Sequence, residues 1–274
     1  MTELDAPICV ACGIQFPPAD APPEACPICT DQRQYVPESG QAWTTLRELR
    51  DGHRTVVRED GELVGIGTEP PFAIGQRALL VPHGEANLMW DCITLLDDAA
   101  EAAVRERGGL TAIAISHPHY YSAMVEWAHA FEVPVLVHAD DRAWIMRPDP
   151  AIELWEGEER DLGDGLTLVR CGGHFAGGTV LHWVGGADGA GALLSGDIVQ
   201  VIPDVAHVAF MYSYPNLIPL PEATVQAIGD KLEPYAFERI YGAWFGRIVR
   251  RDAKGAVRRS VARYGPALRG ELPA

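Results

Sequence analysis

The sequence predicts an α/β (α+β) chain, in which short buried strands alternate with helices behind a small metal-binding module. Three observations lead to this prediction. Apolar and β-branched runs separated by turn residues recur along the chain, two C-x-x-C pairs stand near its start, and histidines directly follow apolar runs. The 274 residues are enough for one large domain and an appendage. We expect the module to occupy residues 1–40 and the domain residues 41–274.

Charge and hydropathy narrow the choice of partner. Acidic residues outnumber basic ones by 38 to 22, and no basic cluster is long enough to follow a phosphate backbone. No apolar run approaches the roughly 20 residues of a membrane-spanning helix, and residues 1–5 lack the apolar stretch of a signal peptide. We therefore expect a soluble, cytoplasmic protein that acts on a small molecule, without nucleic acid or membrane as a partner. The oligomeric state is open.

Four cysteines near the start of the chain form two pairs, Cys9 with Cys12 and Cys26 with Cys29. In a reducing compartment this spacing indicates metal ligands rather than disulfides, because four thiolates complete a tetrahedral site. Prolines fill the linker between the pairs, so this segment needs a metal to fold. Over about residues 7–35 the pattern resembles the rubredoxin-like knuckles of rubrerythrins and short zinc ribbons. Iron would make the module an electron carrier, whereas zinc, which we expect because no redox partner site is evident, would make it structural or a docking unit.

Strands and helices are expected to alternate after this module. Turn pairs such as Asp60-Gly61 separate a first group of strands, which suits one half of a sandwich. The expected strands cover residues 55–58, 63–68, 77–81, 87–93, 110–115, 133–138, 166–170, 179–184, 192–197 and 239–241. The expected helices cover residues 46–50, 97–107, 122–131, 222–232 and 252–264.

Two histidines one residue apart, His117 and His119, follow the apolar run 110–115. In a strand-to-helix loop both imidazoles can face one point, and neutral imidazole is the commonest protein ligand of zinc or iron. The alternative is a pair of solvated loop histidines. Two later residues favour the metal, because His174 stands in a glycine-rich loop and Asp197 ends an apolar run, where an unpaired carboxylate is costly to bury.

Taken in order, these motifs resemble those of the metallo-β-lactamase superfamily over about residues 55–265. The family's motifs are matched as H-x-H-x-D-H at His117 and His119, G-H-x-x-G at residues 173–177, Gly-Asp at residues 196–197 and an upstream Asn-x-x-x-Asp at residues 87–91. The resemblance implies an αββα metallo-β-lactamase sandwich, with the metal site along one edge of its two sheets.

Three positions depart from the family's pattern, because Tyr121, Ser122 and Tyr241 stand where the family has ligands of a second metal. The resemblance therefore implies one ion, held by His117, His119, His174 and Asp197. Zinc or iron(II) at such a site brings the pKa of its water from 15.7 towards about 7, which supplies a hydroxide nucleophile. We expect a metal-dependent hydrolase of an ester, thioester or amide, with Asp197 holding metal and water.

The roles of the two tyrosines stay open. Tyr121 or Tyr241 could donate a hydrogen bond to an oxyanion or protonate a leaving group, ligate iron, or only fill the volume of the lost metal site. The aromatic segment 210–221 is placed near the site by the resemblance, either lining an apolar or aromatic substrate pocket or packing under the next helix. Two other functions are an iron-containing redox protein and a catalytically inactive binding module.

Overall fold

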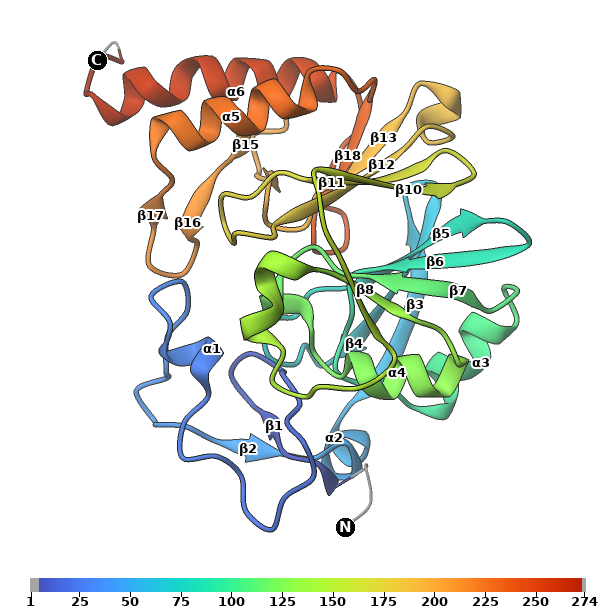
Figure 1. The fold of residues 1–274 in the computed structure, drawn as a ribbon. Coiled ribbons are helices and arrows are strands. Elements are labelled where there is room, and N and C mark those ends of the chain that lie inside the picture. Colours follow the sequence, from blue (N-terminus) through green and yellow to red (C-terminus); the bar gives the residue numbers. More distant parts are fainter. Residues whose placement is uncertain (1–4, 273–274) are drawn as a thin grey trace.

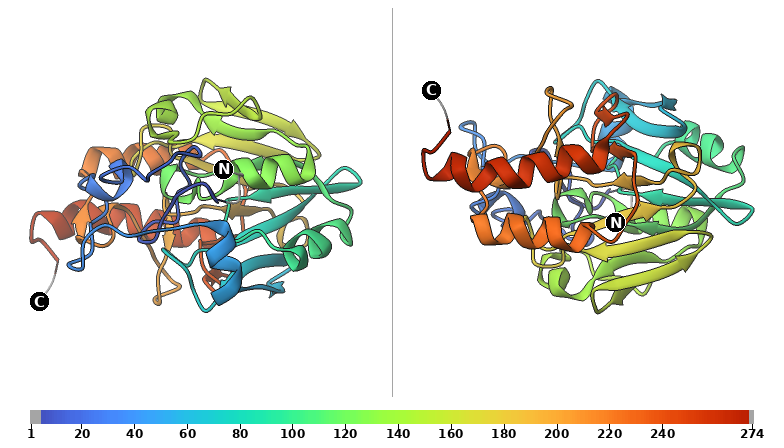
Figure 2. Two further views of the ribbon diagram at one scale, coloured as in Figure 1. Left: turned by 90° about the horizontal axis from the view of Figure 1, so that it is seen from below. Right: turned by 90° about the horizontal axis from the view of Figure 1, so that it is seen from above.

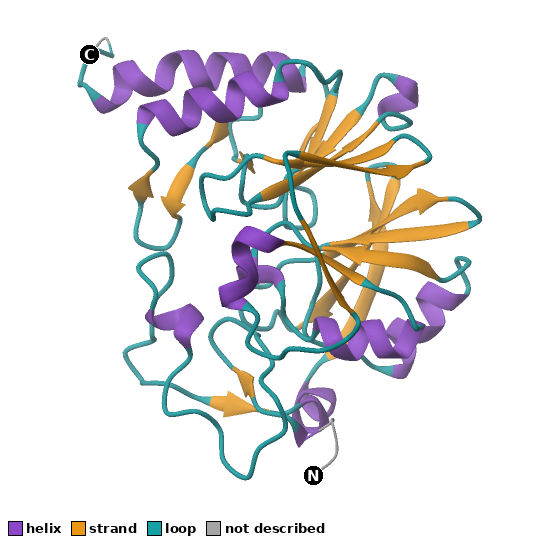
Figure 3. Cartoon of the chain, in the orientation of Figure 1, coloured by secondary structure: helices purple, strands orange, loops and turns teal. Residues whose placement is uncertain are grey.

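Two β-sheets packed face to face form the centre of the molecule, and helices cover the outer face of each (Figure 1, Figure 3). The structure is a computed structural model and describes residues 5–272. Residues 1–4, which carry most of the expectation about a signal peptide, lie outside the described residues. The α/β (α+β) class and the αββα sandwich predicted from the sequence are therefore confirmed.

The first sheet has seven strands in chain order, antiparallel from β3 to β6 and parallel from β6 to β9. Helices α3 and α4 make the crossovers on either side of β7. Their order is β3 (Arg54–Asp60), β4 (Leu63–Glu69), β5 (Ala78–His83), β6 (Ala86–Trp90), α3 (Asp98–Arg105), β7 (Leu110–Ala114), α4 (Met124–Phe131), β8 (Val135–His138) and β9 (Ile152–Trp155). Helix α3 starts where predicted, because the Asp97 side chain accepts the backbone N–H of Ala100 at 2.8 Å.

The second sheet has six strands, and helices α5 and α6 lie side by side across its outer face (Figure 2). All neighbouring strands are antiparallel except β13 and β18. The elements are β10 (Glu159–Gly163), β11 (Leu166–Arg170), β12 (Thr179–Trp183), β13 (Ala192–Leu194), α5 (Glu222–Leu232), β18 (Arg239–Tyr241), β19 (Ile248–Val249) and α6 (Ala253–Leu268). Two small hairpins precede α5: β14 (Gln200–Val201) with β15 (Val208–Ala209), and β16 (Met211–Ser213) with β17 (Ile218–Pro219).

Alternating side chains divide the core into layers. On β12, Leu181 faces the first sheet and joins the inter-sheet cluster, whereas Val180 packs in the cluster beneath α5 and α6. On β7, Ala112 and Ala114 likewise face the second sheet, while Ile113 packs towards α4. A side-chain period of two on both sheets thus produces three apolar layers within the four-layer sandwich.

The N-terminal module packs against the first sheet's helical face. It contains β1 (Ile8–Cys9), α1 (Pro27–Thr30) and β2 (Trp43–Thr44), and α2 (Leu46–Gly52) follows. Its four cysteines belong to the same apolar cluster as Ile113 and Trp127, and Gln15 Nε2 donates to Glu126 Oε1 of α4 at 3.0 Å. The division at residue 40 stays a prediction, although the pairing of β1 with β2 carries the module's backbone contacts to Thr44.

Several short elements were not predicted. Strand β10 has the sequence Glu-Arg-Asp-Leu-Gly and lies at the edge of its sheet, where one side has no neighbour and the apolar alternation is lost. The expected strand 87–93 ends at Trp90 and the expected helix at 122 starts at Met124, because Asp91 and Ser122 adopt positive φ angles of 60° and 47°. Within residues 5–272 no helix is both long and apolar enough to span a membrane.

The inter-sheet layer gives a direct test of this packing. Leu181 is fully buried between the sheets, so we expect Leu181→Ala to lower the free energy of unfolding by about 2–5 kcal/mol. Val184, just beyond the same strand, is 53% exposed, and Val184→Ala should change it by no more than about 0.5 kcal/mol. Chemical denaturation measures both, and equal effects would contradict the assigned layers.

Candidate metal centre

Three loops that follow β7, β11 and β13 bring His117, His119, His174 and Asp197 together. The loop after β7 is tied to the second sheet, because Thr179 N at the start of β12 donates to Ser116 O at 2.9 Å. Gly196 lets the Asp197 loop approach it, since a Cβ at this position would lie 2.4 Å from Ser116 Oγ. The predicted histidines and aspartate thus meet at one edge of the sandwich.

The four side chains have the spacing of a tetrahedral metal site. One possible ligand atom from each lies within 4.8 Å of every other, and all four residues are buried, with at most 5% of their surface exposed. His174 Nε2 and His119 Nδ1 are 3.2 Å apart, and His117 Nε2 lies 3.8 Å from Asp197 Oδ2. Bonds of about 2.0–2.1 Å in a tetrahedron place ligand nitrogens roughly 3.3 Å apart, so these residues fit a zinc-like ion.

Neighbouring groups fix the orientation of the imidazoles. Met211 O accepts a hydrogen bond from His174 Nδ1 at 3.1 Å, which leaves the lone pair of Nε2 facing the other ligands. Ser116 Oγ lies 2.9 Å from His117 Nδ1. His117 Nε2 is buried and makes no hydrogen bond within the described residues, which is costly unless an ion occupies the lone pair.

Burial sets the charge states of the site. It lowers the pKa of His117 and His119 well below the ordinary value and that of His174 to about 4, so all three are neutral, the form that binds metals. Burial raises the pKa of Asp197 to about 7; the Tyr120 hydroxyl opposes this shift and the charge of Asp91 adds to it. A cation at the centre would favour the ionised carboxylate.

A second layer of buried charge lies behind the histidines. Asp91 Oδ1 accepts the Ser116 N–H at 2.8 Å and so positions the loop of His117. Burial raises the pKa of Asp91 to about 6, and the charge of Arg77 opposes this shift. Arg77 is itself 1% exposed and donates to Asp60 Oδ2 at 2.7 Å and to Gly242 O at 2.8 Å. A fixed cation therefore stands among these carboxylates.

The structure places a tyrosine at the site that the sequence analysis did not single out. Residues Pro118–Tyr120 form a 3₁₀ turn, in which side chains three apart lie on the same side, so the Tyr120 ring contacts the ring of His117 edge-on, with centroids 4.3 Å apart. Its hydroxyl is buried without a hydrogen-bond partner within the described residues and faces Asp197 closely enough to affect the pKa of that carboxyl. The only sequence feature that could have indicated this position is that Tyr120 follows the predicted ligand His117 by three residues.

Tyr121, Ser122 and Tyr241, which depart from the family pattern, make contacts outside the group of four ligand atoms. Tyr121 packs beside Ile14 and Met124, and its hydroxyl is buried without a hydrogen bond in the described part of the chain. Ser122 Oγ accepts from Gln76 Nε2 at 3.0 Å, which holds it away from a ligand role. The Tyr241 hydroxyl donates to Glu62 Oε1 at 3.0 Å.

The hydroxyl of Tyr241 lies near the amino ends of β13 and β18, away from the carboxyl end of β13 where the histidine cluster lies. Glu62 Oε1 also accepts from Arg239 at the start of β18 and from the N–H of Ala187 before β13. The histidine cluster instead adjoins the opposite, carboxyl end of β13. The structure therefore does not bring Tyr241 to the four ligand atoms, and its catalytic role stays a prediction that this position does not favour.

The aromatic segment before α5 contacts the centre, while its Phe210 and Leu220 pack in the cluster beneath α5 and α6; that it lines a substrate pocket stays a prediction. The Tyr214 ring lies 5.6 Å from that of His174, and its hydroxyl donates to Asp197 O at 2.9 Å. With Met211 O on His174, this segment positions two of the four ligand residues. Tyr212, on β16, lies further out, over Arg33 of the N-terminal module.

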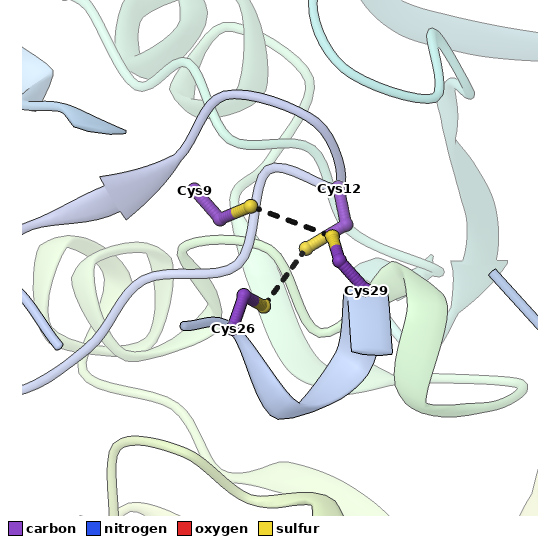
Figure 4. A group of neighbouring side chains, drawn as sticks. All are labelled: Cys9, Cys12, Cys26 and Cys29. Carbon is purple, nitrogen blue, oxygen red and sulfur yellow. Dashed lines mark hydrogen bonds between the residues drawn. The ribbon is translucent and has the colours of Figure 1, made fainter. Parts of the chain in front are cut away.

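A second candidate metal site lies in that module, where Cys9, Cys12, Cys26 and Cys29 converge (Figure 4). Cys9 Sγ lies 3.5 Å from Cys29 Sγ, and Cys12 Sγ lies 3.6 Å from Cys26 Sγ. Bonds of about 2.3 Å from a tetrahedral ion to sulfur imply sulfur–sulfur distances of roughly 3.75 Å, so the thiols fit a single ion. Gln41 Nε2 donates to Cys9 Sγ at 3.2 Å.

Comparison with known proteins supports the fold. The chain superposes on the metallo-β-lactamase DIM-1 with a TM-score of 0.56 and 14% identity, over 75% of this chain and 98% of that one. On the class B3 di-zinc metallo-β-lactamase LRA-12, from an Alaskan soil metagenome, the TM-score is 0.51 at 14% identity, over 79% and 93% of the two chains. Such identities establish the fold alone. The predicted resemblance is thereby confirmed: this is a metallo-β-lactamase-fold chain with a Cys₄ module and a His₃Asp site.

A relative of nearly equal length shows which family this chain belongs to. The chain is 48% identical over 268 residues to the uncharacterized protein YmaE of Bacillus subtilis (strain 168), and the match covers 97% of each chain. The chain therefore belongs to the same family as YmaE. No protein-family model matches the chain.

Metal analysis tests the two sites separately. We expect two ions per chain, one for each ligand cluster, and one ion after either His119→Ala or Cys12→Ser. His129→Ala and Cys92→Ala are matched controls that should keep both, because His129 bonds to Asp149 on the surface and Cys92 lies outside the thiol cluster. Two ions retained in His119→Ala would contradict the assignment of the histidine site.

Proposed function

We propose that the protein is a metal-dependent hydrolase that carries one catalytic ion and acts on an ester, thioester or amide of a small molecule. The observation that carries this proposal is the buried cluster of His117, His119, His174 and Asp197, whose ligand atoms have the spacing of one ion. Three neutral imidazoles and a carboxylate suit zinc, and we propose zinc here and in the Cys₄ site.

A zinc ion bound there would supply Lewis-acid chemistry and a water of lowered pKa. The protein's own groups then orient and move protons. Asp197 points Oδ2 towards His117 and receives Gln200 Nε2 on Oδ1 at 3.4 Å, so the carboxylate is held in one orientation. As one of the four ligand groups, the carboxylate is suited to hold the metal and to keep an attacking water in place.

Tyr120 is the proposed donor to the developing oxyanion. Burial raises the pKa of its hydroxyl well above the ordinary value, so the group stays protonated and donates. The hydroxyl has no partner at ordinary hydrogen-bond geometry within the described residues, and the polar group it faces is the carboxylate of Asp197, whose pKa it lowers. A fixed donor in a buried site stabilises transition-state charge without reorganisation, which is the requirement for acyl transfer.

The buried positive charge of Arg77 supports the proposal that the histidine site holds one ion rather than two. Within residues 5–272 the thiol cluster is the only other group of three or more possible ligand residues gathered closely enough to hold an ion. The carboxylates of Asp60 and Asp91, which would otherwise need a second cation nearby, lie beside the guanidinium of Arg77. A buried arginine can balance such charge without exchange with solvent.

Activity measurements test the proposed reaction. We expect the zinc-loaded protein to hydrolyse 4-nitrophenyl hexanoate or its thioester analogue, and His119→Ala to abolish that turnover because the site can no longer hold its ion. His129→Ala should keep both the activity and the metal. Turnover that persists in metal-free His119→Ala protein would contradict the proposal.

The tyrosines are distinguished by removing single hydroxyls. We expect Tyr120→Phe to lower kcat by about 10²–10³-fold with little change in KM, because the lost donor acts on the oxyanion. Tyr121→Phe tests the role predicted from the family pattern, and Tyr35→Phe, at a position 54% exposed, is the control. A loss confined to Tyr121→Phe would assign the role to Tyr121 instead.

A further inference from the structure

The N-terminal module contacts the hairpin that positions His174. The segment after α1 lies against the β16–β17 hairpin, where Ser213 Oγ donates to Arg33 O at 2.9 Å and Asn216 Nδ2 donates to Gln32 O and Gln34 O at 3.0 and 3.1 Å (Figure 1). The same hairpin begins with Met211, whose carbonyl orients His174. Cys29 precedes this segment by a few residues, so a short stretch of backbone connects the thiol site to the residues that contact this hairpin.

Arg33 is held over the site by three aromatic rings. Its Cζ lies 4.2 Å from the ring centroid of Phe175, 4.9 Å from that of Tyr212 and 5.4 Å from that of Trp144. The Phe175 ring in turn packs against His119 at 4.8 Å and His174 at 5.2 Å. Cation–π contacts of this kind fix a guanidinium without using its N–H groups.

The guanidinium has donors to spare. Nη1 contacts Asp31 Oδ1 at 3.1 Å, whereas Nε is buried and makes no hydrogen bond within the described residues. Arginine carries five N–H donors in a planar fork that matches a carboxylate. The charge of Arg33 acts on His117, His119 and His174 alike, so the group faces the whole cluster rather than one ligand.

A positively charged side chain at this position contrasts with the negative net charge of the chain. With 38 acidic and 22 basic residues, the protein as a whole repels an anionic small molecule. Arg33 places a guanidinium beside three buried imidazoles and among aromatic rings, and Asp31, its ion-pair partner at 3.1 Å, engages only one of its nitrogens in the described contacts. The side chain is 17% exposed, so part of the guanidinium is accessible from solvent.

We propose that Arg33 is a substrate-binding residue of the histidine site, contributed by the Cys₄ module, and that the substrate carries a carboxylate near its scissile acyl bond. This inference rests on the proposed hydrolase function and adds the class of substrate to it. The module then has a definite task, because its metal holds α1 and the following segment that carries Arg33. The rings of Phe175, Tyr212 and Trp144 would flank the apolar part of the same substrate.

Two esters of matched length test the proposal. 4-Nitrophenyl hydrogen adipate and 4-nitrophenyl hexanoate differ by a terminal carboxylate in place of a methyl group. We expect Arg33→Met, which keeps an unbranched side chain but loses the charge, to lower kcat/KM for the adipate ester by about 10- to 100-fold, mainly through KM. The hexanoate ester should change by no more than about twofold, and Arg33→Lys should lie between wild type and Arg33→Met.

A matched control separates charge recognition from loss of packing. Arg58 on β3 also lies over an aromatic ring, with Cζ 4.3 Å from the centroid of Phe245. Arg58→Met should leave the ratio of the two kcat/KM values unchanged. Metal content is measured in every variant, and an equal loss on both esters in Arg33→Met, or no loss, would overturn the inference.

Binding is measured independently of turnover by calorimetric titration of the zinc-loaded protein with adipate and with neutral adipamide. Weaker adipate binding in Arg33→Met, by about 10-fold or more with adipamide unchanged, supports the inference even if neither ester is hydrolysed, a result that would count against the hydrolase alone. Ester hydrolysis without any dependence on Arg33 would overturn the inference and leave the hydrolase standing. Failure of wild-type protein to prefer adipate over adipamide would also overturn it.

Discussion

Burial of four metal-ligand side chains at one edge of the sandwich is the constraint on which the rest of the structure depends. His117, His119, His174 and Asp197 lie where water cannot solvate them, so every lone pair and charge needs a protein group or an ion as a partner. Met211 O and Ser116 Oγ provide two of these partners on the outer nitrogens of the imidazoles. The inner lone pairs face one another, and a cation at their centre is the arrangement that satisfies them together.

The buried charges of Asp91, Arg77 and Asp60, which lie behind the ligands, follow from the same need to pair every buried polar group. Asp91 must be buried to hold the backbone of Ser116, and its carboxylate raises the cost of ionising Asp197. Arg77 offsets the cost of burying Asp91, and its guanidinium is held between Asp60 and the carbonyl of Gly242. Replacing any one of these charges would leave the others unpaired in a low-dielectric environment, which costs more than the pair contributes when intact.

The ligands were predictable from the sequence because they stand at the ends of apolar strands, where a sandwich gathers loops from both sheets. His117, His174 and Asp197 needed only strand positions and spacing. Tyr120 was missed because a 3₁₀ turn shifts the phase by which side chains face the site, and sequence does not distinguish this turn from an α-helical start. Tyr241 replaces a ligand of the family's pattern, but its side chain joins the inter-sheet layer and its hydroxyl bonds to Glu62, an orientation set by packing across two sheets.

Arg33 was beyond sequence reasoning for a related reason, since nothing within its own segment indicates that the module folds back onto the aromatic hairpin before α5. That contact depends on Ser213 and Asn216, which lie some 180 residues further along the chain. The geometry gives the Cys₄ site a consequence beyond local folding: an ion that fixes Cys26 and Cys29 also fixes the end of α1, and hence the start of the segment that carries Arg33. A module that only capped the sheet would not need to place a cation among three rings at the histidine site. With the proposed role of Arg33, the two candidate metal sites would be parts of one substrate-binding arrangement.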